Sequence, residues 1–346
     1  MRFTAMMLAA ALWVPPFAAW AQTPASQPSA GLSEQPPRVS ILEENDSLYF
    51  NTDKHYTQGL RIANLFGGTP APDSWWDNIY DFVGVGPIFE KGGTRRTSVF
   101  VGQSIFTPKN LTIKPPDPKD RPYAGWAYIG ASLLQETHGR MLENVELDFG
   151  MVGPGTLAKQ AQNDFHQFIG ASQAQGWSDQ VQHEFGGMLS YERYWKLPLF
   201  GDNSFGVDFI PEAGATVGNI MTYGDVGGTL RIGKGLAADY GPVRVRPSLS
   251  GTDYFDENGL DDGQGWYFFV GAQGRAVGRN IFLDGNTFRE SRHVPKKNFV
   301  GDAQAGFSVM WTKSLRTDFT VATRSQEFVG QHGTDTVGTA ALTFNW

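Results

Sequence analysis

Long stretches of the chain alternate between apolar and polar residues with a period of two. Val, Leu, Phe and Met alternate with Glu, Asp and Gly over residues 145–151, and residues 226–233, 315–321 and 338–346 repeat the pattern. In a β-strand, successive side chains point to opposite faces. The pattern therefore predicts strands that have one apolar and one polar face.

About twelve such segments can be counted, and each is about ten residues long, as a tilted strand that crosses a bilayer requires. A soluble sandwich would also alternate. The polar faces here carry small residues and charges of both signs, as a barrel interior does, and an even strand number is typical of bacterial single-chain barrels. We therefore predict an all-β fold, a transmembrane antiparallel β-barrel. The predicted strands are 39–50, 56–66, 96–106, 123–135, 144–153, 184–195, 205–217, 226–234, 266–278, 300–311, 315–328 and 336–346.

An even number of strands places both ends of the barrel on the periplasmic side of the outer membrane. The chain ends on a strand with Leu342, Phe344 and Trp346, which resembles the C-terminal signal of outer-membrane barrels. Two connections on the predicted periplasmic side, 67–95 and 235–265, are longer than the short turns expected there. They are the weakest part of this topology.

The first residues have the features of an export signal. Arg2 precedes an apolar run over residues 6–19, and Ala19-Trp20-Ala21 is a small-x-small cleavage site before Gln22. We therefore predict a signal peptide over residues 1–21, a polar, Pro-rich segment over 22–38, and the barrel over 39–346. Beyond the signal, no run of about 18 apolar residues predicts a membrane-spanning helix.

One connection carries a helical pattern instead. Residues 155–170 begin with Thr156 as a helix cap and end at Gly170. Apolar residues, among them Leu157 and Phe165, fall on one face of this helix, while Gln162 and His166 share another. The strand count places this short α-helix in an extracellular loop.

Composition narrows the function classes. The 346 residues include 42 Gly, 25 Phe, 11 Tyr, 10 Trp and no Cys, and the net charge is −7. So much aromatic surface excludes a disordered chain, and the acidic balance without a basic block argues against nucleic-acid binding. The lack of Cys excludes disulfides and thiolate catalysis. Trp75, Trp76 and Trp126 fit interfacial anchors and packing equally well.

Common hydrolase motifs are absent: there is no Gly-x-Ser-x-Gly elbow, His-Glu-x-x-His or phosphate-binding loop. The remaining polar motifs fall on the predicted extracellular side. Together they resemble the outer-membrane lipid A 3′-O-deacylase family from about residue 40 to the C-terminus. The resemblance rests on Glu44-Asn45-Asp46, Tyr56-Thr57-Gln58-Gly59, Gln103-x-Ile105-Phe106-Thr107-Pro108, Asp120-Arg121-Pro122-Tyr123-Ala124-Gly125, Val152-Gly153-Pro154, Gln162-Asn163-x-x-His166-x-x-Ile169-Gly170-Ala171 and Asp284-Gly285-Asn286-Thr287-Phe288.

The resemblance implies a twelve-stranded barrel that uses calcium to hydrolyse the ester of the 3′-linked acyloxyacyl group of lipid A. It makes His166 the base that activates water, a role suited to imidazole at neutral pH. It implies that Asn45 and Asp46 hold Ca²⁺ and the oxyanion, and that Thr57 and Gln162 line the site. A metal held by such oxygen ligands can polarise an ester carbonyl, so no serine nucleophile is needed.

Substrate contacts and one metal ligand are less well defined. The lysine that meets a glucosamine phosphate is Lys109 or Lys114, because this loop does not align uniquely, and Arg121 belongs to the same basic cluster. Ser172 stands where some members of the family have an acidic residue, so one ligand of calcium is missing. The expected partners are lipopolysaccharide and outer-membrane lipids, with the chain as a monomer.

Simpler interpretations remain open. Asn45 and Asp46 could form an ordinary turn, and His55, near a loop tip between charged residues, is expected at the surface. An outer-membrane phospholipase would share the barrel and calcium but would use a serine beside a strand histidine. A non-catalytic pore or adhesin would have an open interior and dispensable His166 and Asp46.

Overall fold

The computed structural model describes residues 35–47, 54–84, 88–89, 93–245 and 252–345. The predicted signal peptide, most of the Pro-rich segment and Trp346 lie outside the described residues. The strands are β1 (Arg38–Asn45), β2 (His55–Leu65), β3 (Thr94–Thr107), β4 (Ala124–Thr137), β5 (Met141–Val152), β6 (Glu184–Trp195), β7 (Leu197–Gly201), β8 (Gly206–Gly218), β9 (Met221–Lys234), β10 (Gly265–Asn280), β11 (Phe299–Thr312), β12 (Leu315–Arg324) and β13 (Asp335–Asn345). The α-helices are α3 (Trp75–Val83), α4 (Ala158–Ile169) and α5 (Ile281–Asp284), and short 3-10 turns lie at Pro154–Thr156, Gly176–Asp179, Leu236–Ala238 and Glu257–Gly259.

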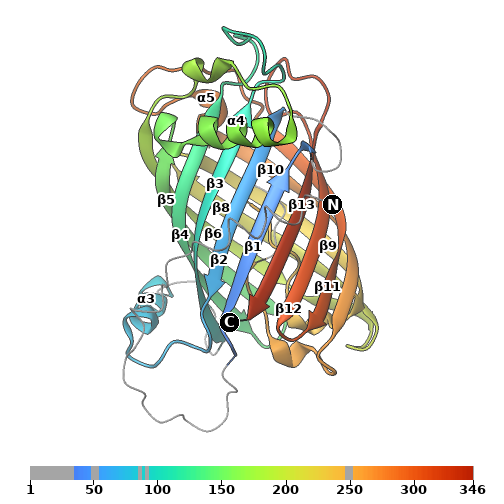
Figure 1. The fold of residues 1–346 in the computed structure, drawn as a ribbon. Coiled ribbons are helices and arrows are strands. Elements are labelled where there is room, and N and C mark those ends of the chain that lie inside the picture. Colours follow the sequence, from blue (N-terminus) through green and yellow to red (C-terminus); the bar gives the residue numbers. More distant parts are fainter. Residues whose placement is uncertain (1–34, 48–53, 85–87, 90–92, 246–251, 346) are drawn as a thin grey trace. The chain divides into compact units, whose positions relative to one another are not determined.

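The strands form one antiparallel sheet that closes into a barrel (Figure 1). From β1 to β6 and from β7 to β13, each strand pairs with the next; β1 pairs with β13, and the pairing of β6 with β8 completes the ring. The five-residue β7 follows β6 after Lys196 and pairs with the start of β8, so twelve strands make up the closed ring. The predicted barrel is confirmed. β1 ends at Asn45 and β12 at Arg324, earlier than expected.

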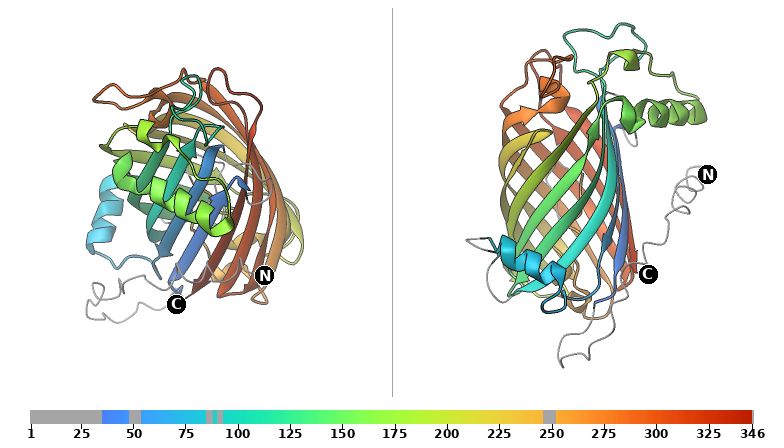
Figure 2. Two further views of the ribbon diagram at one scale, coloured as in Figure 1. Left: turned by 45° about the horizontal axis from the view of Figure 1, so that its top comes forward. Right: turned by 90° about the vertical axis from the view of Figure 1, so that its left-hand side faces the viewer.

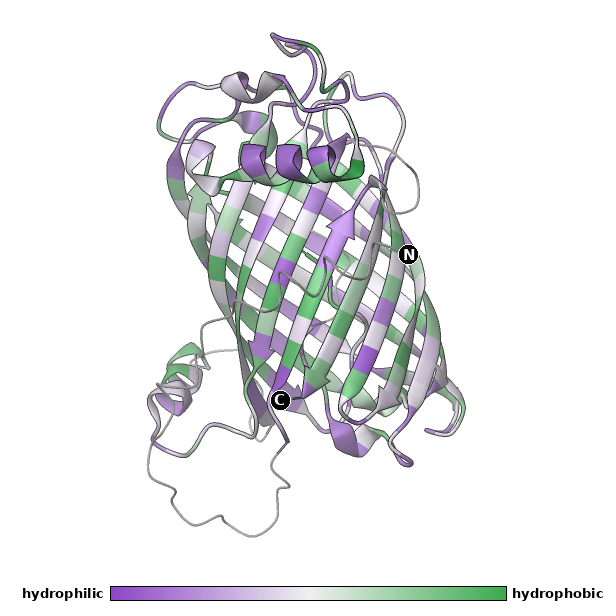
Figure 3. Cartoon of the chain, viewed as in Figure 1, coloured by the Kyte–Doolittle hydropathy of each residue, from purple (hydrophilic) through white to green (hydrophobic). Residues whose placement is uncertain are grey.

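The alternation seen in the sequence separates the two faces of the wall (Figure 3). Side chains on the outer face are apolar and exposed, including Ile129, Leu147, Phe149, Phe185, Val217, Val226, Phe268 and Val270. Side chains on the inner face are polar or charged and buried, including Arg61, Glu146, Asp148, Ser190, Glu192, Arg231, Gln273 and Asp318. This inverted polarity is that of a barrel whose outer wall meets lipid. None of the described helices is long and apolar enough to span a membrane.

The connection 235–265 is longer than a simple turn because its described parts fold into the barrel. Asp239 is fully buried there and forms ion pairs with Arg231 of β9 and Arg316 of β12. The Tyr267 hydroxyl of β10 donates to the same carboxylate over 2.9 Å. Asp208 and Asp318 of the wall pair with the same two arginines, so the acid from this connection joins them in balancing the buried positive charges.

A second acid of the same connection reaches the opposite part of the wall. Asp253 pairs with Arg61 of β2 at 2.7 Å and accepts a hydrogen bond from Ser98 of β3 over 2.9 Å. The connection therefore contacts strands from both halves of the ring. The described parts of the connection thus occupy the lumen, and a cavity of about 30 Å³ lies between them and the wall, next to Arg61, Glu146 and Asp253.

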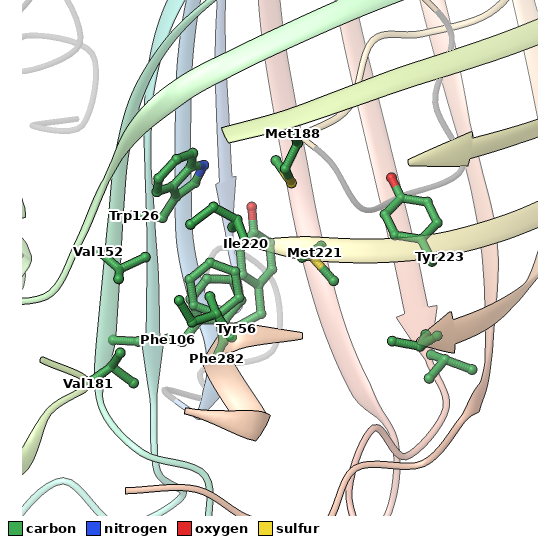
Figure 4. Close-up of a cluster of buried hydrophobic side chains, with 14 of the residues drawn as sticks. Tyr56, Phe106, Trp126, Val152, Val181, Met188, Ile220, Met221, Tyr223 and Phe282 are labelled. Atoms are coloured by element: carbon green, nitrogen blue, oxygen red, sulfur yellow. The ribbon is translucent and has the colours of Figure 1, made fainter. Parts of the chain in front are cut away.

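The α4 end of the lumen is closed by an apolar cluster (Figure 4). Phe106 of β3 stacks on Phe282 of α5 with ring centroids 4.1 Å apart, and Tyr56 packs against Phe106 at 5.4 Å. Trp126 is only 3% exposed and belongs to this cluster, so packing is its role.

The two longer helices lie on the outside of the barrel, at opposite ends (Figure 2). The second long connection, 67–95, contains α3, and the loop after β5 contains α4. Arg38 of β1 is paired with Asn345 of β13 at the α3 end, so both termini of the barrel lie there, as the even strand count predicts.

Candidate active site

The candidate residue of β1, Asn45, lies on the outer face of the wall. Ser40 and Glu44 of this strand contact Asp253 and Arg244 inside the barrel. Successive side chains of a strand point to opposite faces, so Asn45, the residue after Glu44, points outward. Asn45 is paired with Gln58 of β2 and is 8% exposed. A buried polar residue on a face that is otherwise apolar marks this end of the wall as a specialised surface.

Thr57 sits on a β-bulge. In the pairing of β2 with β3, Tyr56 faces Phe106 and Gln58 faces Ile105, so Thr57 is the extra residue. A bulge re-aims the side chain that it inserts and is common beside active sites. The Thr57 hydroxyl is hydrogen-bonded to the Thr107 hydroxyl over 2.7 Å, which fixes its position.

Helix α4 packs against this surface from outside. Ile105 of β3, outward because Phe106 points inward, packs with Ala158 of α4 and with Trp177. Gln103, also outward, donates to the Thr156 carbonyl over 2.7 Å, just before the helix. These contacts hold α4 on the wall near the ends of β1 and β2.

His166 is buried on the face of α4 that meets the wall, with 5% of its surface exposed. Its Nδ1 lies 2.6 Å from the carbonyl oxygen of Ser172. Because a carbonyl can only accept a hydrogen bond, Nδ1 carries the proton, and Nε2 carries the lone pair of the neutral ring. Asn163 exchanges two hydrogen bonds with the backbone of Ala174 and so holds the Ser172 segment against the helix.

Gln162, one turn before His166, is held equally firmly. The Trp177 indole donates to its Oε1 over 2.8 Å, and both side chains are at most 2% exposed. An indole only donates, so this bond assigns the oxygen of the amide and leaves the NH₂ as the donating end.

Helix α4 packs on the wall through the face that carries Gln162 and His166, and not through the face with its larger apolar residues. The buried residues are Ala158, Gln162 and His166, whereas Leu157 and Phe168 are 58% and 57% exposed. The cap differs from the prediction: Leu157, in a left-handed conformation with φ of 59°, precedes the helix, and Thr156 ends the preceding 3-10 turn. Gly170 ends the helix as predicted, with φ of 74°.

Asn45 and Asp46 form the turn out of β1. Asn45 Oδ1 accepts from the Ser47 amide over 2.8 Å, and Asp46 Oδ2 accepts from the Lys54 amide over 2.6 Å. Asp46 is 2% exposed, and its own amide donates to the Thr57 carbonyl over 3.3 Å. These are the backbone contacts of an ordinary polar turn, and the two oxygen-bearing side chains lie beside the bulge, so their functional role stays a prediction.

These strands and this helix bring Asn45, Asp46, Thr57, Gln162 and His166 to the same end of the barrel. A family model described as "Outer membrane protein LpxR" matches residues 3–346 of the chain. The chain belongs to the LpxR family. The barrel accordingly lies in the outer membrane, with its α3 end, where both strand termini meet, in the periplasm and its α4 end at the cell surface.

Solved structures agree with this family in fold. LpxR from Salmonella typhimurium is 18% identical, covers 89% of this chain and 100% of its own, and has a TM-score of 0.70. The β-domain of the Bordetella autotransporter BrkA is 9% identical, with a TM-score of 0.43 and 90% and 99% of the two chains covered. This second structure is only distantly similar to the chain. No curated protein sequence matches the chain.

The predicted phosphate contacts of this LpxR family member separate into two groups. Lys109 and Lys114 are exposed in the loop after β3, where both can reach a ligand. Arg121 is fully buried, lies 4.8 Å from the centre of the Phe106 ring, and pairs with Glu327 at 3.1 Å. Its Nη1 is thus bonded within the barrel, whereas its Nε and Nη2 have no hydrogen-bond partner among the described residues, and its contact with a phosphate stays a prediction.

His55 was expected at the surface, and this expectation is wrong. The ring is 2% exposed, with Nδ1 2.7 Å from Asp335 and Nε2 3.5 Å from Asp120. Burial by itself raises the pKa of Asp120, but hydrogen bonds from His55 and from the amides of Lys109 and Arg121 outweigh it, so this pKa lies below its ordinary value. His55 therefore ties the loop after β3 to β13.

A calcium site can be tested against the donor atoms present. Asn45 and Asp46 offer the hard oxygen atoms that calcium prefers, out of roughly six to eight that it takes. The described residues contain no group of three or more His, Asp or Glu side chains able to hold a metal. Ser172 uses its backbone carbonyl for His166. The donor chemistry fits, and among the described residues Asn45 and Asp46 would supply part of the ligand set.

Two contributors to the site escaped the sequence analysis. Trp177 orients Gln162, and the carbonyl of Ser172 orients His166. Every residue has a backbone carbonyl, so the residue type at position 172 does not reveal its role. Trp177 follows Gly176 in a loop without periodicity. No sequence signal could have assigned either role.

Proposed function

We propose that this protein hydrolyses the ester that joins the 3′-linked acyloxyacyl group to lipid A, with His166 as the general base. The observation that carries the proposal is the hydrogen bond from His166 Nδ1 to the Ser172 carbonyl. It selects the tautomer whose Nε2 can accept a proton from water, and it supports the positive charge that follows.

The reaction balances with the residues of this chain and one water molecule. His166 Nε2 takes a proton as the water oxygen bonds to the ester carbonyl carbon, which gives a tetrahedral oxyanion. When the bond from this carbon to the sugar oxygen breaks, the imidazolium returns the proton to that oxygen. The products are a free acyloxyacyl acid and lipid A with a free 3′-hydroxyl.

Donors around the ester would stabilise the oxyanion. The Gln162 amide, held through its oxygen by Trp177, has its NH₂ as the donating end. Asn45 and Asp46 would hold Ca²⁺, and the bound metal would supply further polarisation of the carbonyl. Lys109 or Lys114 would meet the lipid A phosphate. One copy of the chain supplies every residue named, and we propose that the enzyme acts as a monomer.

The test is mass spectrometry of lipid A from cells that express the full chain, His166→Ala or Asp46→Ala. We expect the wild-type chain to remove a mass equal to one acyloxyacyl group, and both variants to leave lipid A intact. Chelation of calcium in isolated membranes should also stop the reaction. All three barrels should show the same heat-dependent gel mobility, which separates loss of chemistry from loss of folding.

Two outcomes would overturn the proposal. Unchanged lipid A together with released lysophospholipid would favour a phospholipase. Unchanged lipid A without any lipid product, from a folded wild-type barrel supplied with calcium, would favour a non-catalytic role.

A further inference from the structure

We propose that α3 is a membrane-interface helix whose exposed edge, formed by Trp75 and Phe82, sits in the periplasmic phospholipid leaflet of the outer membrane. This surface is independent of the proposed lipid A chemistry at the other end of the barrel. The argument rests on how α3 is fixed to the wall, which way its edges point, and what surface it adjoins.

Helix α3 is built onto the outer wall. It begins at Ser74, whose hydroxyl accepts from the Asp77 amide over 3.2 Å, and it ends at Gly84. The buried Tyr80 hydroxyl accepts from the amide of Leu134 on β4 over 3.0 Å and donates to the carbonyl of its cross-strand partner, Arg96 on β3. A hydroxyl inserted between two paired strands fixes the helix in one place and one rotation.

The polar edge of α3 points toward the ends of the strands. Asp77 and Asp81 pair with Arg95 at 2.6 and 3.0 Å, and Arg95 also donates to Gln135 over 3.2 Å. Arg95 is the second residue of β3, so this edge faces the periplasmic rim. Trp75 and Phe82 lie on the other edge, because their helical positions are centred roughly a third of a turn around the helix from the two acids.

The apolar edge adjoins the lipid-facing wall. Beneath α3, Leu133 of β4 and Val145 of β5 are cross-strand partners and are buried against the helix. Further along the same face toward the cell surface, Ile129, Leu147 and Phe149 are 60%, 57% and 58% exposed. The helix thus lies where the apolar belt of the barrel ends.

Phospholipid is the occupant that this geometry favours. Trp75 and Phe82 are 63% and 81% exposed, and they extend the same surface that lipid must cover around a barrel in the outer membrane. Tryptophan is enriched where headgroups meet acyl chains, and a helix with one apolar and one charged edge lies in that plane. Figure 3 shows the apolar colouring of α3 beside the barrel wall.

The absence of cysteine makes a direct test possible. Single variants Phe82→Cys and Asp81→Cys, the latter an exposed position on the polar edge of the same helix, would be labelled with an environment-sensitive fluorophore and refolded in phosphatidylcholine vesicles. Lipid carrying a shallow nitroxide should quench the probe at position 82 at least threefold more than the probe at 81. Aqueous iodide should give the reverse order.

Equal quenching of the two positions by lipid and by iodide would overturn the proposal. Disulfide formation between two Phe82→Cys barrels at high lipid dilution, with loss of lipid quenching, would also overturn it and assign the surface to a second copy. Trp75→Cys provides an independent position on the same edge, where the result should match that at 82. Unchanged heat-dependent gel mobility verifies that each variant is folded.

Discussion

Helices α3 and α4 both pack on the outer wall, at opposite ends of the barrel, but they bury different kinds of side chain. Each lies on the outer wall near β3 and β4 and leaves an apolar edge exposed. Helix α3 buries apolar side chains together with Tyr80, whose hydroxyl bonds to the backbone of the wall. Helix α4 buries Gln162 and His166. Gln162 and His166 are the two residues that the proposed chemistry needs, and both are polar, so packing alone would favour their exposure to water.

The difference shows how a site can be recognised in a barrel of this kind. Exposed apolar residues on the outer wall need no explanation, because lipid covers them. Polar side chains buried on the same wall do, because each must be satisfied by a specific partner. On α4, Trp177 and the Ser172 carbonyl are such partners for Gln162 and His166. On α3, the buried hydroxyl of Tyr80 is bonded to the backbone of the wall and serves to attach the helix.

The largest effect should come from removing the side chain that fixes α3. Tyr80→Ala deletes a buried ring and its hydroxyl, and we expect it to destabilise the docked helix by about 3–5 kcal/mol. Protease cleavage within residues 67–93 should rise accordingly, while lipid A deacylation in detergent is retained. Tyr80→Phe is the matched control: it keeps the ring and removes only the hydroxyl that bonds to Leu134 and Arg96, so its cleavage should fall between that of the wild type and that of Tyr80→Ala. Loss of deacylation with an intact barrel would show that the two ends are coupled.

A smaller effect should come from the partner of Gln162. Trp177→Phe keeps an aromatic ring but leaves the buried Gln162 oxygen without its indole donor, at a cost of about 1–3 kcal/mol. If that cost falls on the transition state, kcat should fall roughly tenfold to a hundredfold. Trp75→Phe on α3 is the control and should not change kcat. A Trp177→Phe enzyme with unchanged kcat would contradict the positioning role.

The smallest effect is expected at Ser172. Because its carbonyl, not its hydroxyl, is bonded to His166, Ser172→Ala should keep deacylation within about twofold of the wild type. Ser172→Pro changes the backbone of the same segment and should reduce activity strongly. Kinetics on purified, folded variants would check both. A strong loss in Ser172→Ala would mean that the side chain itself contacts metal or substrate.

The sequence predicted the barrel well, because an alternation of period two needs only residue types. It also predicted where α4 begins and ends to within a few residues. It did not predict which face of α4 is buried, because an apolar stripe marks contact with lipid as readily as contact with a core. His55 was misplaced for a related reason. Its partners Asp120 and Asp335 are distant in sequence, and local charge alone suggested water.

The sequence predicted the site as a set of residues, and the structure adds the groups that position their side chains. Asn45, Asp46, Thr57, Gln162 and His166 were all chosen from motifs. The bulge that presents Thr57 and the carbonyl that orients His166 depend on strand register and loop path. Register and path follow from the whole closed sheet, which residue types do not encode locally.

The segment inside the barrel has a consequence for how the fold is held together. Asp239 and Asp253 bring it inward to meet arginines of β9, β12 and β2, strands from different parts of the ring. The same connection therefore braces the wall from within, and removal of either carboxylate would leave buried arginines with fewer partners.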